Sequence, residues 1–278
     1  MKFSLIQATL GRTVEIERFL ESLDGQTLRD FELIVVDQNP DDRLVPILAP
    51  YRERFEIKHL RSERGLSKAR NAALPHLRGD VVSFPDDDCW YPKGVLERVA
   101  TFLDAHPEAD GLNGCSLTAD LEPRGRWSQV EGRVTKLGLF NRTISYAIFI
   151  RRKVIERVGQ FDETLGLGAQ TPWQGAEDYD YILRAVSQGC SICYRPELYV
   201  HHDAFPAFND SNIKRTLQMC TGTGRFLSKH RYPLWYIGYW FAGSLGLAGL
   251  ALLRGNRARA KYHWLSTVGR YQGWAARV

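Results

Sequence analysis

Strand-like apolar runs alternate with helix-like segments through the first hundred residues, and this alternation limits the possible folds more than any other feature. Residues 31–36 (FELIVV) form a run that is apolar except for Glu32, which is typical of a parallel strand buried on both faces. Shorter apolar runs at 3–8, 55–60 and 81–84 are also predicted to be strands, and 14–23 and 66–77 show helical spacing. This alternation predicts an open α/β sheet.

Polar residues follow several of these predicted strands at the point where each strand ends. Thr9 follows the first strand, Asp37 follows the second, and the acids Asp86, Asp87 and Asp88 follow the strand at 81–84. In open α/β sheets, ligands bind at the carboxyl ends of the strands. We therefore expect these side chains to converge on one crevice.

The acidic triplet lies in the stretch SFPDDDCWYP, between apolar and aromatic residues. Three adjacent carboxylates facing a cleft repel one another unless a cation neutralises them. A divalent ion such as Mg²⁺ does this, since it binds one or two carboxylates together with substrate phosphates. A solvated acidic loop that caps the helix beginning near Pro92 explains the triplet equally well, and both interpretations stay open on this stretch alone.

Charge divides the 278-residue chain into two parts. Every formally charged residue after Asp210 is basic, eleven in all, which exceeds the net charge of +5 of the whole chain, so residues 1–210 are net acidic. The composition, 44% hydrophobic and 25% charged, is that of a globular protein able to bury a large core. These observations predict a domain at 1–210 and a basic, aromatic helical region at 211–278.

Residues 232–253 carry no formal charge and are long enough to span a bilayer. A crossing would translocate the basic residues that follow, against the positive-inside bias, and Pro233 with four glycines disfavours a straight span. We therefore expect a re-entrant or interfacial segment on an anionic membrane surface. The alternative is a soluble apolar helix pair packed on the first domain, and nucleic-acid binding suits so apolar a segment poorly.

The N-terminus and the cysteines bear on localisation. The first residues, MKFSLIQATLGR, have too short an apolar run for a signal peptide, and five cysteines fit a reducing compartment better than a disulfide framework. The expected place is the cytoplasm, peripheral on the cytosolic face of the membrane.

Four motifs in order resemble the family 2 glycosyltransferases. These are FELIVVDQ, RGLSKARNAAL, GDVVSFPDDDCWYP and GAEDYDYILRA, and the resemblance covers roughly residues 1–205. It implies the GT-A fold, a Rossmann-like mixed sheet flanked by helices, and an enzyme that takes a sugar from a nucleotide-diphosphate donor. The loop ATLGRT lacks the proline and asparagine common in relatives, so the donor's identity stays open.

The resemblance also assigns a donor site. Thr9 is expected to contact the nucleotide, and Asp37 to accept a hydrogen bond from the base, commonly uracil, which favours a UDP-sugar. Arg70 is expected near the nucleotide or pyrophosphate. Within the triplet, Asp86 and Asp87 are assigned to the ribose and Asp88 to Mg²⁺ or Mn²⁺, although the register of the metal ligand is ambiguous.

The remaining assignments concern catalysis. Asp178 is expected to be the general base of an inverting displacement, with Glu177 orienting the acceptor; acids that oppose the dipole of a first helical turn are the structural alternative. His201 is expected to complete the metal site, with His202 facing the other way. Trp173 is equally well a sugar-stacking or a core residue.

The predicted function is transfer of a sugar to a hydroxyl of a lipid-linked or polysaccharide acceptor. Two other functions are weighed against it. A sugar nucleotidyltransferase needs a glycine-rich phosphate loop after the first strand, and ATLGRT has one glycine. A non-catalytic binding protein is expected to have lost Asp178 or the triplet, and both are present. The sequence does not reveal the oligomeric state.

Overall fold

The computed structural model describes residues 1–203 and 210–276, which divide into two compact units. The first unit comprises Met1–Phe161 and residues 178–203. The second unit comprises the segment Asp162–Glu177 and the helices from residue 210 onward. The second unit therefore contains an internal segment in addition to the C-terminal region expected from the charge pattern.

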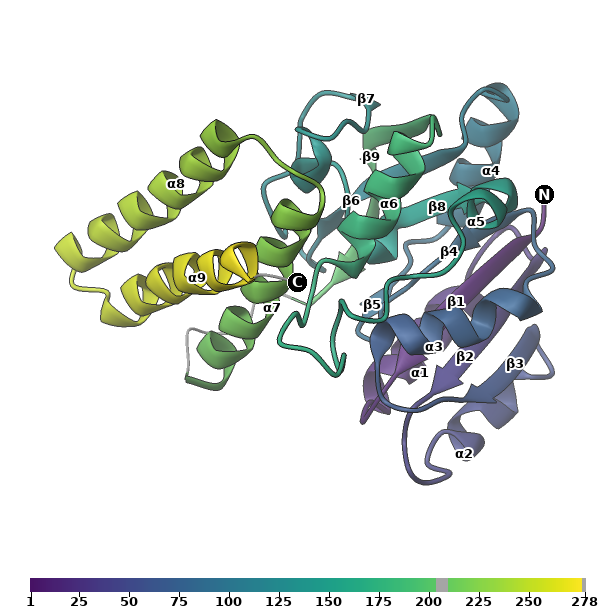
Figure 1. Ribbon diagram of the computed structural model, residues 1–278. Coiled ribbons are helices and arrows are strands. Elements are labelled where there is room, and N and C mark those ends of the chain that lie inside the picture. The colour runs from purple at the N-terminus through teal and green to yellow at the C-terminus, as the bar shows by residue number, and fades with distance from the viewer. Residues whose placement is uncertain (204–209, 277–278) are drawn as a thin grey trace. The chain divides into compact units, whose positions relative to one another are not determined.

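The first unit is built on a mixed sheet with the strand order β3-β2-β1-β4-β8-β6-β9-β5, and β7 pairs with β9 (Figure 1). Strands β3, β2, β1 and β4 are parallel, β8 is antiparallel to β4 and β6, β6 is parallel to β9, and β5 and β7 are antiparallel to β9. The strands are β1 Phe3–Thr9, β2 Phe31–Asp37, β3 Glu56–Arg61, β4 Val81–Ser83, β5 Cys89–Trp90, β6 Gly111–Leu117, β7 Gly132–Arg133, β8 Ile148–Arg151 and β9 Ile192–His202.

Helices flank this sheet and share its core. Leu20 and Leu23 of α1 and Leu96 of α4 pack in one buried cluster with strand residues such as Leu33 and Phe149. The helices of the unit are α1 Val14–Asp24, α2 Val45–Leu48, α3 Leu66–Ala73, α4 Val95–Ala105, α5 Arg152–Val158 and α6 Glu177–Ser187, whose first residue belongs to the second unit. Short 3₁₀ turns occur at Ala49–Tyr51, Leu74–His76, Leu139–Asn141 and Ser145–Ala147.

The strands expected from the apolar runs are confirmed to within about one residue, and the mixed sheet agrees with the expected fold class. One helix is shorter than its spacing predicted. The segment 66–77 forms α3 only as far as Ala73 and continues as the 3₁₀ turn Leu74–His76. Pro75 explains the change, because proline has no N–H to donate to the helix and clashes with the preceding turn.

The second unit contains the helices α7 Asp210–Lys229, α8 Leu234–Leu253 and α9 Arg257–Ala275 (Figure 1). Helices α7 and α9 pack backbone against backbone at glycines. A Cβ added to Gly224 would lie 2.0 Å from the Arg270 oxygen, and one added to Gly273 would lie 1.9 Å from the Thr221 oxygen. No side chain larger than glycine fits at these two positions without displacing a helix.

The apolar segment 232–253 forms one continuous helix, so it makes neither a re-entrant turn nor a helix pair. Pro233 is the N-cap of α8, a position where its missing N–H interrupts no hydrogen bond. The glycines weaken a helix by about 1 kcal/mol each without ending it. In the described part of the chain, α8 alone is long and apolar enough to cross a membrane, and 17% of its apolar window is buried.

Candidate functional site

Two of the expected donor-site residues lie at the ends of adjacent strands. Parallel pairing of β1 with β2 sets Thr9 opposite Asp37, at the carboxyl edge of the sheet. Thr9 Oγ1 also donates to Asp87 Oδ2 at 2.8 Å, which joins the end of β1 to the loop after β4. The structure therefore brings Thr9, Asp37 and the acidic triplet to one edge, as the strand ends predicted.

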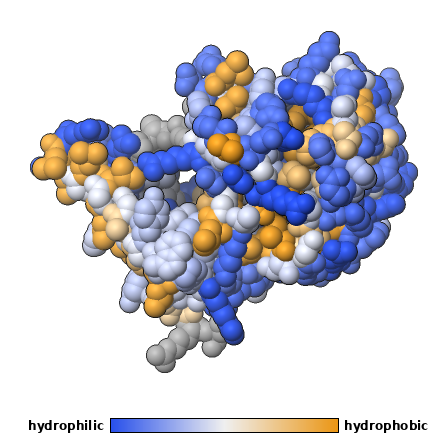
Figure 2. All heavy atoms as spheres, turned by 90° about the horizontal axis from the view of Figure 1, so that it is seen from above, coloured by the Kyte–Doolittle hydropathy of each residue, from blue (hydrophilic) through white to orange (hydrophobic). Residues whose placement is uncertain are grey.

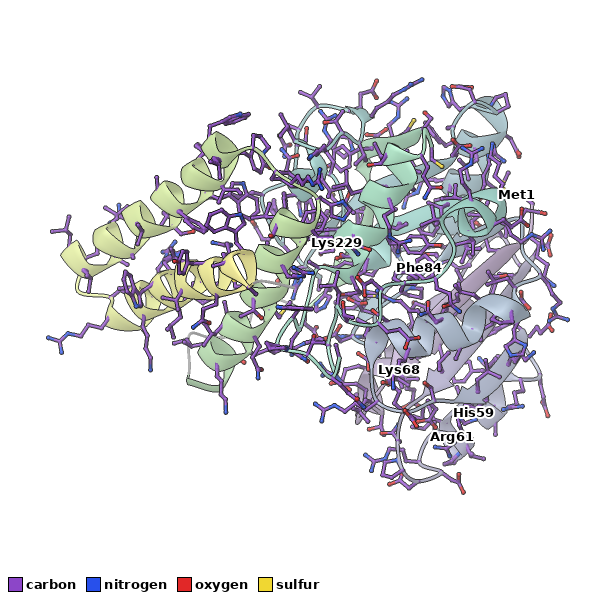
Figure 3. The ribbon with its side chains drawn as sticks, viewed as in Figure 1. Met1, His59, Arg61, Lys68, Phe84 and Lys229 are labelled. Atoms are coloured by element: carbon purple, nitrogen blue, oxygen red, sulfur yellow. The ribbon has the colours of Figure 1, made fainter. Side chains whose placement is uncertain are left out.

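Asp37 is fully buried, and its carboxylate contacts Asn39 in the loop that follows and two residues of β3. Oδ1 accepts from the backbone N–H and from Nδ2 of Asn39, both at 2.8 Å, and Oδ2 lies 3.0 Å from His59 Nε2 and 3.0 Å from Arg61 Nη1. His59 and Arg61 lie close together on β3 (Figure 3). Since a carboxylate has about four acceptor positions, a hydrogen bond from a base requires one of these partners to leave.

Asp86 faces the interior of the first unit and contacts Arg70. Arg70 Nη2 lies 3.2 Å from Asp86 Oδ1, and the guanidinium is buried over the rings of Phe84 and Phe161, at 5.7 and 5.4 Å from their centroids. Ser145 Oγ donates to the same carboxylate at 3.2 to 3.3 Å. A buried guanidinium paired with a carboxylate in this way supplies a fixed positive charge at the sheet edge.

Asp87 lies between the other two acids and shows the consequence of their proximity. Burial raises the pKa of Asp87 to about 6, and the charges of Asp88 and Asp86 add to this, although the hydrogen bond from Thr9 opposes it. Like charges therefore do repel within the triplet, as expected from the sequence. A cation bound at this edge would lower the pKa of Asp87 again.

Asp88 is paired on both oxygens. Oδ1 lies 2.8 Å from His202 Nε2, and Oδ2 lies 3.0 Å from Arg12 Nη2. Burial by itself raises the pKa of Asp88, but the hydrogen bond and charge of His202, together with Arg12, outweigh burial and leave this pKa below its ordinary value. Asp88 is thus held as a carboxylate.

The histidine on Asp88 is His202 and not His201. His201 lies on the other face of β9, where its Nδ1 is 2.9 Å from the Thr118 oxygen and its ring stacks on Trp90. His202 Nδ1 lies 3.1 Å from the Asp203 oxygen, and Nε2 is the ring nitrogen that faces Asp88 and donates to its carboxylate. Loss of the Nε2 proton would free this nitrogen to bind a metal beside Asp88.

Asp88 and His202 fit a divalent cation. Two adjacent ligand atoms, each about 2.1 Å from an octahedral ion, lie roughly 3 Å from one another. This separation is close to the 2.8 Å between Asp88 Oδ1 and His202 Nε2. In residues 1–203 and 210–276, no three His, Cys, Asp or Glu side chains are grouped to hold a metal. Two protein ligands suit Mg²⁺ or Mn²⁺, which take their remaining ligands from water and substrate phosphates, and do not suit a structural zinc site.

Asp178 lies near Asp86 and the two are joined through Ser145. Asp178 Oδ2 accepts from the backbone N–H of Ser145 at 3.2 Å, while Ser145 Oγ donates to Asp86. Arg70, Ser145 and Asp178 also line one small cavity, with Phe84, Ile148, Phe161, Tyr181 and Ile182. The two acidic motifs of the sequence therefore meet at a single site.

The neighbours of Asp178 in α6 differ from it. Asp180 is fully buried and pairs with Arg184 Nε at 2.8 Å, which gives it a structural partner one helical turn away. Glu177 is buried and belongs to the second unit. Two further residues of the site were not expected from the sequence. Ser145 carries no motif, and Arg12 is a lone basic residue in the loop after the first strand, which is a signal for a counter-charge.

Comparison with known proteins places this site in a family. A profile of glycosyl transferase family 2 matches residues 4–159. The PGL/p-HBAD biosynthesis glycosyltransferase of Mycobacterium bovis is 30% identical over 232 residues, which cover 80% of this chain and 86% of that protein. The poly(ribitol-phosphate) β-N-acetylglucosaminyltransferase TarS of Staphylococcus aureus is 31% identical over 159 residues, 53% of this chain. This match spans only 26% of the length of TarS.

Solved structures show the same fold. A crystal structure of TarS with UDP-GlcNAc matches with a TM-score of 0.60 and 21% identity, covering 100% of this chain and 93% of that one. The mannosyltransferase PcManGT of Pyrobaculum calidifontis, in complex with GDP-Man and Mn²⁺, matches with a TM-score of 0.68 and 16% identity, covering 99% and 88%. The chain belongs to glycosyl transferase family 2 and is a glycosyltransferase with the GT-A fold.

Proposed function

We propose that this glycosyltransferase moves a sugar from a nucleotide-diphosphate donor, with a UDP-sugar favoured, to a hydroxyl of a lipid-linked or polysaccharide acceptor, inverting the anomeric carbon. The observation that carries the proposal is Ser145, which contacts Asp86 on the donor side and Asp178 on the other side. This contact puts the Asp178 carboxylate next to the acids that are assigned to the nucleotide. TarS, a relative named for a poly(ribitol-phosphate) polymer, supports the acceptor class.

The donor is held at the edge of the sheet. Thr9, Asp37, Asp86 and Asp87 contact the nucleoside, with Asp37 exchanging one of its present partners for the base. Arg70 supplies positive charge near the pyrophosphate. Asp88 and His202 hold Mg²⁺ or Mn²⁺; His202 is preferred to the initially assigned His201 because its Nε2 faces Asp88. When bound, such an ion stabilises the negative charge that develops on the leaving diphosphate.

The chemistry is a single displacement. Asp178 accepts the proton of the acceptor hydroxyl, the hydroxyl oxygen bonds to the anomeric carbon, and the bond from that carbon to the diphosphate oxygen breaks, its electron pair leaving with the diphosphate. The N–H of Ser145 orients the Asp178 carboxylate. Glu177 is assigned to acceptor orientation. Because one base acts on the face opposite the leaving group, the configuration inverts.

We further propose that the enzyme is peripheral on the cytosolic face of the membrane, at anionic lipid. Helix α8 carries no charge and exposes Leu234, Trp235, Tyr239 and Leu253, each by more than 60%. Arg254 follows α8 directly, and Arg257 and Arg259 lie in the first turn of α9; all three are exposed. In Figure 2, hydrophobic residues form patches among hydrophilic residues on the face of the protein that is drawn. Apolar surface next to arginines matches an anionic bilayer interface.

The proposal is tested by a donor screen and by Asp178→Asn. Purified protein with Mn²⁺ is incubated with UDP-GlcNAc, GDP-mannose and other nucleotide sugars, and release of nucleoside diphosphate is measured. Asp178→Asn should bind UDP as the wild type does but turn over roughly 10²–10⁴-fold more slowly, the usual contribution of a positioned base. Near-normal turnover in Asp178→Asn, with loss in Asp180→Asn, would move the base to Asp180.

A further inference from the structure

The segment Asp162–Glu177 ends at the residue that directly precedes Asp178, yet it belongs to the second unit. Within that unit it folds on itself through Gln174, whose side chain bonds Gly168, Ala169 and Thr171 at 2.6 to 2.8 Å. It is therefore a compact loop with its own hydrogen bonds. Glu177 is the last residue of this loop, so its position depends on the contacts that hold the loop in place.

Helix α7 holds this loop at both ends and in between. Lys229 Nζ pairs with Asp162 Oδ2 at 2.7 Å, and the Arg225 guanidinium lies 4.6 Å from the centroid of the Trp173 ring. Thr221 Oγ1 donates to the Pro172 oxygen. Residues 221, 225 and 229 are each four apart, so they share one face of the helix.

The tightest contact is between two glycines. Gly222 on α7 meets the backbone of Gly175, and a Cβ added to Gly222 would lie 2.3 Å from the Gly175 oxygen and 2.6 Å from its nitrogen. Both atoms are backbone, so neither can rotate away. The loop would have to move by about 1 Å to reach an ordinary van der Waals distance.

The backbone directly after this contact is strained. Ala176 has φ of +69°, in the left-handed region that residues with a Cβ seldom adopt. Such a conformation costs on the order of 1–3 kcal/mol and persists only where the surroundings enforce it. Gly175 is pinned by α7 on one side of Ala176, and α6 begins with Glu177 on the other.

We propose that α7 is a positioning element for the reaction: through Thr221 and Gly222 it fixes the loop Asp162–Glu177 and thereby sets the approach of the chain to Asp178. This inference rests on the proposed role of Asp178. It assigns to the C-terminal helices a catalytic function in addition to any contact with lipid. Thr221 and Gly222 are positioning residues and contact no reacting atom.

Four variants test this. Gly222→Ala displaces the loop, and Thr221→Val removes the hydroxyl while keeping the shape of the side chain. Thr221→Ser keeps the hydroxyl, and Gly238→Ala on α8, where an added Cβ meets nothing within 4 Å, is the matched glycine control. Hydrogen exchange of peptides within 162–177, nucleoside diphosphate release from UDP-GlcNAc and GDP-mannose, and UDP binding with Mn²⁺ are measured for each.

In Gly222→Ala and Thr221→Val we expect faster exchange in 162–177 and roughly 10- to 100-fold slower release, since a misplacement of about 1 Å can reduce turnover that much. UDP binding should be unchanged, and Thr221→Ser and Gly238→Ala should behave as the wild type. Unchanged exchange or release in both variants, or a loss of UDP binding as large as the loss of turnover, overturns the proposal. If Asp178→Asn alone departs from expectation and turns over at a near-normal rate, the assignment of Asp178 as the base is overturned instead.

Discussion

At the scale of single residues, the site depends on which charged groups face one another. Asp88 is engaged by Arg12 and His202, and Asp86 by Arg70 and Ser145, so each carboxylate of the outer pair has its own set of partners. Asp87 has a hydroxyl partner in Thr9, a long ion pair with Arg12 at 3.9 Å and two acidic neighbours, and burial raises its pKa to about 6. The three adjacent acids thus have three distinct environments.

The two adjacent histidines give a matched test of the metal site. His202→Ala should weaken Mn²⁺ binding by roughly 10- to 100-fold in the presence of UDP, because one of two protein ligands is lost. His201→Ala removes a ring of the same size from the other face of β9 and should leave Mn²⁺ affinity unchanged. Asp88→Ala should abolish metal-dependent UDP binding.

Titration calorimetry or the paramagnetic resonance signal of Mn²⁺ provides the readout. Normal Mn²⁺ affinity in His202→Ala together with weakened affinity in His201→Ala would return the ligand to His201. Unchanged UDP affinity in Asp88→Ala with Mn²⁺ present would remove Asp88 from the metal site.

At the scale of elements, an ion pair between the buried Glu32 and the exposed Arg78 ties the strands to the turn before β4. Glu32 on β2 is fully buried and accepts from Ser4 Oγ at 2.6 Å, from the Arg78 backbone N–H at 2.7 Å and from Arg78 Nε at 2.8 Å. Burial raises the pKa of Glu32, but these hydrogen bonds from Ser4 and Arg78 outweigh it and leave the pKa below its ordinary value. The carboxylate form is therefore the one that stabilises the fold.

Glu32→Gln should lower the free energy of unfolding by about 1–3 kcal/mol at pH 7, the usual effect of disrupting buried hydrogen bonds to a charged group. The pKa of Glu32 is depressed in the folded state. Its contribution to the free energy of unfolding is therefore complete above the unfolded pKa of 4.5, and it is lost as the pH falls through the pKa of the folded state. The difference between wild type and variant should therefore shrink on acidification.

Urea denaturation of both proteins at several pH values from 7 downward measures this. Glu63→Gln is the surface control, since the Glu63 side chain is 81% exposed in its pair with Lys68 and should matter little. A difference between wild type and Glu32→Gln that stays constant or grows as the pH falls would contradict this account of Glu32.

At the scale of the whole molecule, the second unit combines two proposed tasks. Helix α7 supports the loop Asp162–Glu177, while α8 exposes apolar side chains, and arginines are exposed in the turn after α8 and at the start of α9. Removing α8 and α9 would also uncover the glycine face of α7, so membrane contact is better tested by substitution than by truncation.

We expect the intact protein to sediment with anionic vesicles at low salt, to loosen partly as salt rises, and to be released by detergent. Each basic residue near the surface contributes on the order of 1 kcal/mol and is screened by salt, whereas apolar burial is not. Replacing Arg254, Arg257 and Arg259 by Gln should remove most of the salt-dependent part. Replacing Arg29, Arg43 and Arg54 of the first unit, which are also exposed, is the charge-matched control.

Vesicles of phosphatidylglycerol mixed with phosphatidylcholine, compared with phosphatidylcholine alone, supply the measurement. Protein that stays in the supernatant with anionic vesicles at low salt would contradict membrane attachment. Equal loss of vesicle binding in the two arginine variants would show that the net charge of the protein, and not the position of Arg254, Arg257 and Arg259, accounts for the salt-dependent binding.

The sequence by itself determined the features that depend on neighbours along the chain. Apolar runs and helical spacing located the main strands and helices, because burial on one or both faces imposes a period on consecutive residues. The carboxyl ends of parallel strands lie at the same edge of a sheet, so the sequence was enough to assign Thr9, Asp37 and the acidic triplet to one site.

Only the tertiary structure decided features that depend on register and long-range packing. The pairing of β9 with β6 shifts between Asn113 and Cys115, so alternation counted along β9 does not tell which histidine faces Asp88. Ser145 carries no local pattern and joins Asp86 to Asp178 only through folding. The loop Asp162–Glu177 lies with helices from residue 210 onward because Gly175 fits against Gly222, a contact between backbones that leaves no periodic trace in the sequence.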